Sequence, residues 1–140
     1  MAKVSTFLYC EGVQNDVTPT GPKMHIIGPM QILTPMFIPS MFSFSVVIGI
    51  IDTNMKMPHK FRLLLKGPDE QIIIDTGESI IPINNAKVIP NLPEDMQGFM
   101  GSIDFRNVAI RQEGTYEIEV FFDDESMGKF PIKAKGVENK

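Results

Sequence analysis

Hydrophobic and polar residues alternate with a period of two along much of this chain. The clearest segment is Met41–Ile51, in which every second residue is large and apolar. These residues are Phe42, Phe44, Val46, Ile48 and Ile50. Such alternation in a run rich in β-branched and aromatic residues is typical of a β-strand. Its second side is also fairly apolar, so we expect a central strand that is covered on both faces.

The same two-residue alternation of apolar and polar positions predicts two hairpins. His59–Lys66 places Phe61, Leu63 and Leu65 on one side, and the turn residues 67–70 connect it to a returning strand, Gln71–Asp75. Near the end, Thr115–Phe122 and Lys129–Lys135 have matching apolar sides and are joined by a polar turn that contains a glycine. Turn chemistry between two alternating runs predicts antiparallel pairing in both places.

Three further strands are predicted from weaker patterns. Lys3–Cys10 leaves its inner face open between the even-numbered residues 4–10 and the pair Phe7 and Tyr9. Lys23–Met30 ends in Gly28-Pro29, which favours a sheet edge or a bulge. Ile103–Ile110 changes phase halfway, and a bulge near Arg106-Asn107 would reconcile its two halves.

No segment keeps the 3.6-residue apolar period of an amphipathic helix over three turns. Residues 93–98 fit one helical turn, because a proline precedes two carboxylates there. The rest of Pro82–Met100 is a long connection. The sequence therefore predicts one all-β domain over residues 1–140, a β-sandwich of about eight strands with at most one short helical turn.

The order of these elements resembles a family of small bacterial proteins known only as a domain of unknown function. Its features are a short apolar opening strand (residues 6–10), a Lys-x-x-Ile-Ile-Gly element (23–28) and a long apolar strand after a proline (39–51). A Gly-x-Tyr-x-x-x-Val segment (114–120) followed by Phe-Pro-Ile (130–132) closes the chain. The resemblance implies an immunoglobulin-like sandwich, in which Tyr116 lies in the core or at a corner. It implies no catalytic residue.

Charge and cysteine content narrow the function classes. The chain has 13 Lys and Arg against 17 Asp and Glu, a net charge of −4, which argues against a nucleic-acid binder. The longest apolar run is about half of a membrane span, and no leader or lipidation signal is found. The single cysteine excludes an internal disulfide and multi-cysteine metal sites. We expect a cytoplasmic protein without a membrane segment or cofactor.

Three residues are candidates for nucleophilic or acid–base chemistry: Cys10, His25 and His59. A cysteine-dependent hydrolase needs a thiolate that is held by a histidine, and no surrounding motif indicates one. We interpret Cys10 as a small buried residue and place both histidines at the surface or in turns. The cysteine hydrolase is kept as a second alternative function, and no catalytic residue is assigned.

Carboxylates gather at the predicted turns, around residues 15–16, 52–54, 69–70 and 123–125. Calcium requires six to eight oxygen ligands, which loops at one end of a sandwich can supply. No loop shows the spaced Asp-x-Asp pattern, and Asp and Asn are common turn residues. A small-ligand or calcium-binding sandwich is therefore the first alternative function, with no metal ligand assigned.

The most unusual segment is Gly28–Pro39, which is apolar and contains three prolines and two methionines. Its possible protein-contact residues are Met30, Ile32, Leu33, Met36, Phe37 and Ile38. Apolar loops either plug the end of a sandwich or contact a partner. We expect a non-enzymatic protein-interaction module, which self-associates as a homodimer through Met24–Ile38 rather than through the Lys- and Pro-protected closing strand.

Overall fold

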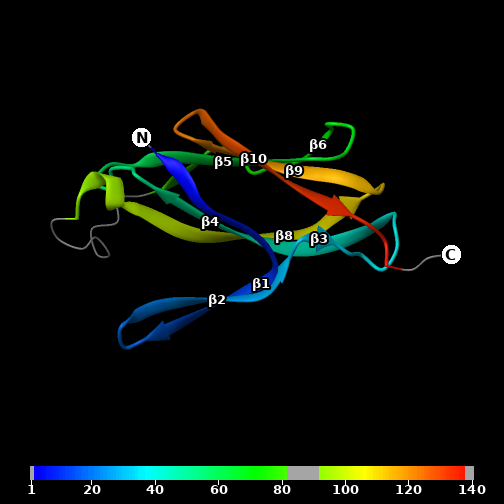
Figure 1. Ribbon diagram of the computed structural model, residues 1–140, viewed down its shortest axis with the longest axis horizontal. Coiled ribbons are helices and arrows are strands. Elements are labelled where there is room, and N and C mark those ends of the chain that lie inside the picture. The colour runs from blue at the N-terminus through cyan, green and yellow to red at the C-terminus, as the bar shows by residue number, and fades with distance from the viewer. Residues whose placement is uncertain (1, 82–91, 138–140) are drawn as a thin grey trace.

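The computed structural model describes residues 2–81 and 92–137, and it consists of two β-sheets that face each other (Figure 1). One sheet has the order β2-β1-β4-β8, with β1 at Lys3–Thr18, β2 at Gly21–Met30, β4 at Ser40–Ile51 and β8 at Gly98–Ile110. The other has the order β3-β10-β9-β5-β6, with β7 beside β5. Its strands are β3 (Ile32–Leu33), β5 (His59–Lys66), β6 (Ile72–Asp75), β7 (Ser79–Ile81), β9 (Gly114–Phe122) and β10 (Glu125–Ala134).

The prediction of an all-β sandwich is confirmed. The described residues contain ten strands rather than about eight, because β3 and β7 are two and three residues long and leave no periodic signal. The one helical turn among the described residues is the 3-10 element η1, Glu94–Met96. Residues 82–91 of the predicted connection lie outside the described residues. No helix in the described part of the chain is long and apolar enough to cross a membrane.

The hydrophobic core lies between the two sheets and is built on the strands with the clearest alternation. Phe44 on β4 packs its ring against Phe105 at 5.3 Å between centroids and against Tyr9 at 5.9 Å. Tyr116 on β9 is buried, and its hydroxyl donates to the carbonyl of Gln112 at 2.7 Å. This bond reaches back four residues and confirms the predicted core or corner role of Tyr116.

A bulge in β1 explains why its alternation is weak in the sequence. The register with β4 shifts between Val4 and Thr6, which moves the inner face from the even-numbered to the odd-numbered residues. Phe7 then stacks on Phe130 with 4.2 Å between ring centroids, and the Tyr9 hydroxyl donates to the Phe130 carbonyl. The inner face left open by the sequence is therefore the one that carries Phe7 and Tyr9.

The bulge predicted in β8 is confirmed. Phe44 lies opposite Phe105 and Phe42 lies opposite Val108, so two residues of β8 face a single residue of β4. Asn107 takes up the extra length with a φ of 55°, a conformation that asparagine tolerates well. Alternation therefore changes phase at this point, as the sequence pattern indicates.

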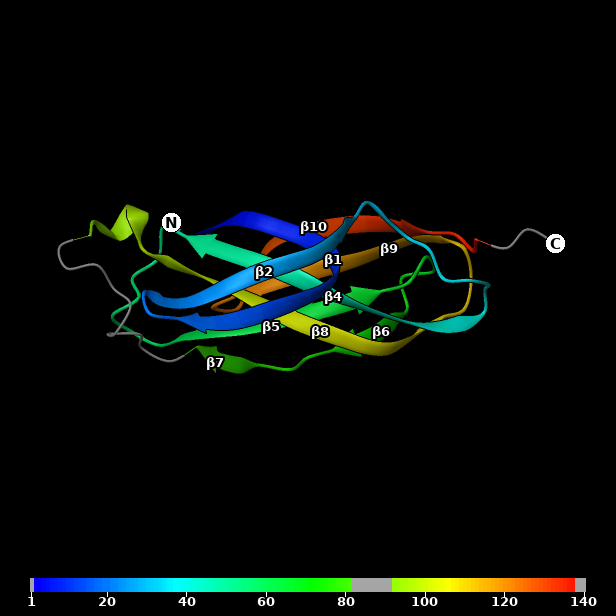
Figure 2. The same cartoon turned by 90° about the horizontal axis from the view of Figure 1, so that it is seen from below.

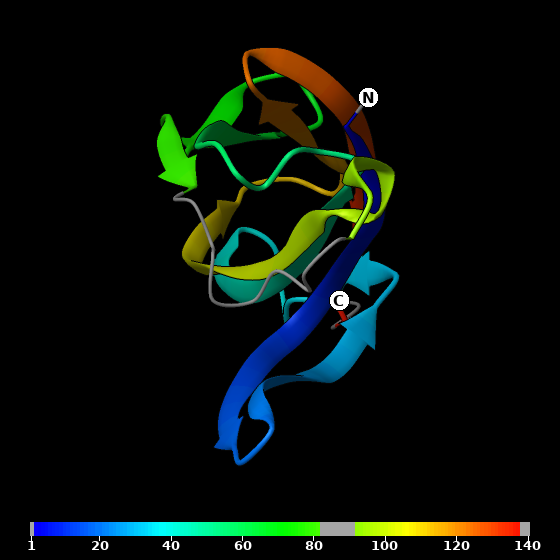
Figure 3. The same cartoon turned by 90° about the vertical axis from the view of Figure 1, so that its left-hand side faces the viewer.

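The second half of β1 leaves the sandwich. Pairing between β1 and β4 ends at Cys10, and beyond this residue β1 pairs only with β2 among the described residues. Residues 12–27 thus form a two-stranded ribbon, which we call the arm. Figures 1 and 3 show the arm extending away from the two facing sheets. β1 is longer than the predicted Lys3–Cys10 because it continues into this ribbon.

Candidate functional site: the projecting arm

The register of the arm gives it two chemically different faces. Val13 lies opposite Ile26, and Asn15 lies opposite Met24. Residues that are opposite each other in an antiparallel pair point to the same side, so one face is largely apolar and includes Val17 two residues further on. The positions between them place Gln14, Asp16, Lys23 and His25 on the other, polar face, with the exposed Ile27 at its base.

The polar face is internally bonded, whereas the apolar face is open. Asp16 lies 3.0 Å from the His25 ring, which is exposed as predicted, and the Gln14 side-chain amide donates to Asp16. On the apolar face, Val17 is 93% exposed and Ile26 is 40% exposed. A two-stranded ribbon without a third strand is marginally stable in water. The arm therefore has the composition of an element that packs against something else.

The structure divides the predicted contact residues into two groups. Leu33 is fully buried, and Met30 and Ile38 pack against the core from partly buried positions. Ile32, Met36 and Phe37 are exposed by 48%, 59% and 59%. The segment after β2 is therefore part end plug and part exposed apolar surface, and the partner contact predicted for the exposed part stays a prediction.

A short parallel pairing holds this segment against the end of the chain. β3 pairs with β10, and the amides of Lys135 and Val137 donate to the carbonyls of Leu33 and Pro35 at 3.0 and 2.9 Å. The terminal part of β10 therefore has a neighbouring strand, whereas the Lys and Pro residues of the closing strand predicted an exposed edge.

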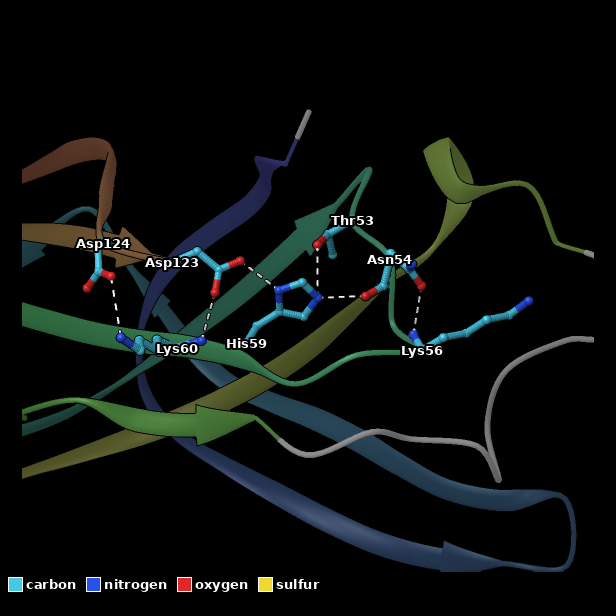
Figure 4. Close-up of polar contacts among 7 residues, drawn as sticks. All are labelled: Thr53, Asn54, Lys56, His59, Lys60, Asp123 and Asp124. Atoms are coloured by element: carbon cyan, nitrogen blue, oxygen red, sulfur yellow. Dashed lines mark hydrogen bonds and ion pairs between the residues drawn. The ribbon is translucent and has the colours of Figure 1, made fainter.

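His59 is buried, and its predicted surface or turn position is wrong. Its side chain is 6% exposed and stacks on Phe122 at 4.9 Å. As Figure 4 shows, Nδ1 lies 2.7 Å from Asp123 Oδ2, and Nε2 lies 2.6 Å from the Asn54 carbonyl. The ring thus connects the loop after β4 to the turn between β9 and β10.

Thr53, His59 and Asp123 resemble a catalytic hydroxyl–histidine–carboxylate series, but the hydrogen bonds differ. Nε2 lies 3.3 Å from the Thr53 hydroxyl and is closer to the Asn54 carbonyl, which can only accept. The shorter contact of Nε2 is therefore with a backbone carbonyl and not with the hydroxyl that a catalytic base would have to activate. This geometry gives His59 a structural role.

The pKa directions at the remaining candidates agree with structural roles. Burial by itself raises the pKa of Asp123, but hydrogen bonds from the Lys60 amide and the His59 ring outweigh it and leave the pKa below its ordinary value. Cys10 is fully buried, as predicted, and burial raises the pKa of its thiol. A raised pKa leaves less thiolate, the form that nucleophilic catalysis requires.

Acidic residues near the predicted turns adopt turn conformations or bond to neighbouring groups of the protein. Asp52, Glu70, Asp123 and Asp124 all have positive φ values, which is turn geometry. Both carboxylate oxygens of Asp75, the last residue of β6, accept hydrogen bonds from the Arg62 guanidinium. These bonds, together with one from the Gly77 amide, lower the pKa of Asp75 to about 2. Within residues 2–81 and 92–137, no three His, Cys, Asp or Glu side chains gather in a way that could hold a metal.

Three pockets on the surface of the described residues are small. The pocket around Lys60 and Arg62 has a volume of about 140 Å³, and both cations have carboxylate partners there. A second, beside Tyr116 and Arg111, has about 170 Å³, and a third, where the arm leaves the sheet near Glu11 and Asp104, has about 210 Å³. Sites for drug-sized ligands usually exceed about 300 Å³.

The fold and the arm define a class of protein: a two-sheet β-sandwich with a projecting amphipathic ribbon. The chain belongs to the family of unknown function DUF6941, whose model matches residues 5–135. A comparison with curated proteins gave no match. Among solved structures, the chain is similar to a β-glucosidase from Listeria innocua in complex with gluconolactone, with 9% identity and a TM-score of 0.40. That similarity covers 94% of this chain and 16% of the glucosidase chain.

Proposed function

We propose that this protein is a non-enzymatic protein-interaction module and that the arm is its contact element. The observation that carries the proposal is the open apolar face of the arm, on which Val17 is 93% exposed. The tertiary fold of the described residues does not cover this face, and a bare two-stranded ribbon gains little stability from its own pairing. A protein partner that packs on this face would cover its apolar side chains and would stabilise the ribbon.

The apolar side chains account for a modest part of the binding energy. Covering the exposed parts of Val17 and Ile26 contributes about 2–4 kcal/mol before the costs of association are subtracted. Among the described residues, the outer edge of β1 beyond Cys10 pairs with no strand, and it adds backbone hydrogen bonds if the partner presents an extended segment. Together these terms suit reversible recognition better than permanent assembly.

A pair of matched substitutions tests the proposal. Ile26→Lys places a charge on the apolar face, whereas Gln14→Lys places the same charge on the polar face of the same ribbon. In affinity purification from the native organism, we expect a partner that is recovered with wild type and Gln14→Lys and lost with Ile26→Lys. Equal recovery with both variants would place the contact elsewhere, and no specific partner with any of the three would contradict the function.

A cytoplasmic location, an immunoglobulin-like relationship and a bacterial origin are part of the same proposal. A cytoplasmic location suits the buried free thiol of Cys10, which has no disulfide partner in a chain with one cysteine. The corner hydrogen bond of Tyr116 supports an immunoglobulin-like relationship of the sandwich. A bacterial origin rests on the resemblance of the sequence motifs alone.

A further inference from the structure

The edges of the two sheets differ in how well they are protected against pairing with another chain. Proteins protect edge strands by shortness, proline, lysine or a covering segment. β6 and β7 have four and three residues, and β2 contains Pro22, Lys23 and Pro29. On β10, β3 covers the end of the strand, and Lys129 and Pro131 lie before it.

Outside the arm, β8 is the exception. Among the described residues it pairs only with β4, beside which it runs in Figure 2, so β8 and β2 are the two ends of the strand order in this sheet. Residues 98–105 form a continuous run of eight residues without proline or lysine, and Asp104 is their only charged residue. The bulge at residues 106–107 ends this run. No strand of the described residues pairs with its outer backbone amides and carbonyls, which form a template for another strand.

We propose that β8 pairs in antiparallel fashion with β8 of a second copy of this chain, around a two-fold axis at Ser102. Odd-numbered residues of this run face the core, as the contacts of Phe99 with Phe122 and of Phe105 with Phe44 show. Pairing like face with like face requires a register that matches odd residues with odd residues. Centring on Ser102 meets this condition and uses the whole run up to the bulge.

The side chains of the run complement one another in this register. Phe99 lies opposite Phe105 of the second copy, and Gly101 lies opposite its Ile103. A Cβ atom built on Gly101 would meet nothing within 4 Å, so there is space beside it for the neighbouring isoleucine. Asp104 lies opposite Met100 of the other copy, which keeps the two aspartates apart, whereas a register centred on Asp104 would place them face to face.

The same pattern favours a second copy over a foreign strand. A pairing strand must present apolar side chains on the core side of the sheet and other side chains on the outer side, as β8 itself does. One edge that meets its own copy closes as a dimer and leaves no further free edge of this kind. This inference goes beyond the proposed function, because the dimer would hold two arms at opposite ends of one continuous sheet and so could bind a repeated partner with avidity.

Opposite charges placed at Ser102 test the proposal. Because Ser102 meets itself on the axis, both Ser102→Lys and Ser102→Glu bring like charges together, and each should raise the dimer dissociation constant at least about tenfold. An equimolar mixture of the two variants should restore the dimer. Ser79→Lys, on the exposed strand β7, is the matched control and should leave the dimer unchanged.

Size-exclusion chromatography with light scattering at high micromolar concentration reads the result. A wild-type monomer, a dimer that survives Ser102→Lys, or variants that stay monomeric when mixed would each overturn the proposal. A monomer that instead binds an extended peptide along β8 would also overturn the choice of occupant. The Ile26→Lys variant of the arm should remain dimeric, so that failure of this inference and failure of the proposed function are distinguishable.

Discussion

The buried His59 offers the sharpest test of how the loop after β4 is held to the sandwich. His59→Ala removes a hydrogen bond to a charged partner, Asp123, which is typically worth about 1.5–3 kcal/mol. It also leaves the Asn54 carbonyl without its donor, which costs about 1–3 kcal/mol, and removes the stacking on Phe122, about 0.5–1.5 kcal/mol. Because these losses overlap, we expect the free energy of unfolding to fall by about 3–5 kcal/mol.

The second histidine is a matched control, since it also lies beside an aspartate but is exposed. His25→Ala should change the free energy of unfolding by less than about 0.5 kcal/mol. Urea unfolding followed by circular dichroism measures both variants, and equal m-values would show that only stability has changed. A loss below about 1 kcal/mol for His59→Ala would refute the structural role assigned to this ring.

Three further predictions follow from named contacts. Arg62→Gln should return the pKa of Asp75 from about 2 toward its ordinary value of 3.8, measured by NMR titration; an unchanged pKa would contradict the assigned cause. Native Cys10 should react slowly with a thiol reagent and rapidly in urea, and fast native labelling would contradict its burial. The pKa of Asp123 is lower in the folded than in the unfolded chain, so its ionised carboxylate stabilises the fold at pH values above the unfolded pKa. The loss of stability caused by Asp123→Asn should therefore shrink as the pH falls below about 4. A constant difference down to pH 2 would contradict it.

Local pattern was sufficient for the parts of the fold where one face is buried and the register is regular. β4, β5 and β9 were predicted to within one residue at each end, and the β8 bulge was visible as a change of phase. In β1 the bulge between Val4 and Thr6 turns even-numbered residues inward before it and odd-numbered residues inward after it. Alternation alone could therefore not select the inner face. The two-residue strand β3 depends on a pairing with β10 that is a hundred residues away in sequence.

The arm and the histidine site were missed for a related reason, because both depend on tertiary placement. The sequence shows alternation in residues 13–17 only weakly, and nothing in it indicates that β1 parts from β4 after Cys10. His59 follows a proline and begins a strand, a position that is usually exposed. It is buried because the loop before it folds over the ring, with the Thr53 amide bonded to the Gln97 carbonyl at 3.2 Å.

Site-specific photo-crosslinking at Val17 in living cells is the most direct test of the arm as a contact element. A photoreactive residue at this position, on the exposed apolar face, should give a discrete crosslink to one partner protein. The same residue at Glu70, in the turn between β5 and β6, is the control and should give none. A discrete crosslink from position 17 alone is the predicted result, and identical patterns from both positions, or none from either, would contradict the account.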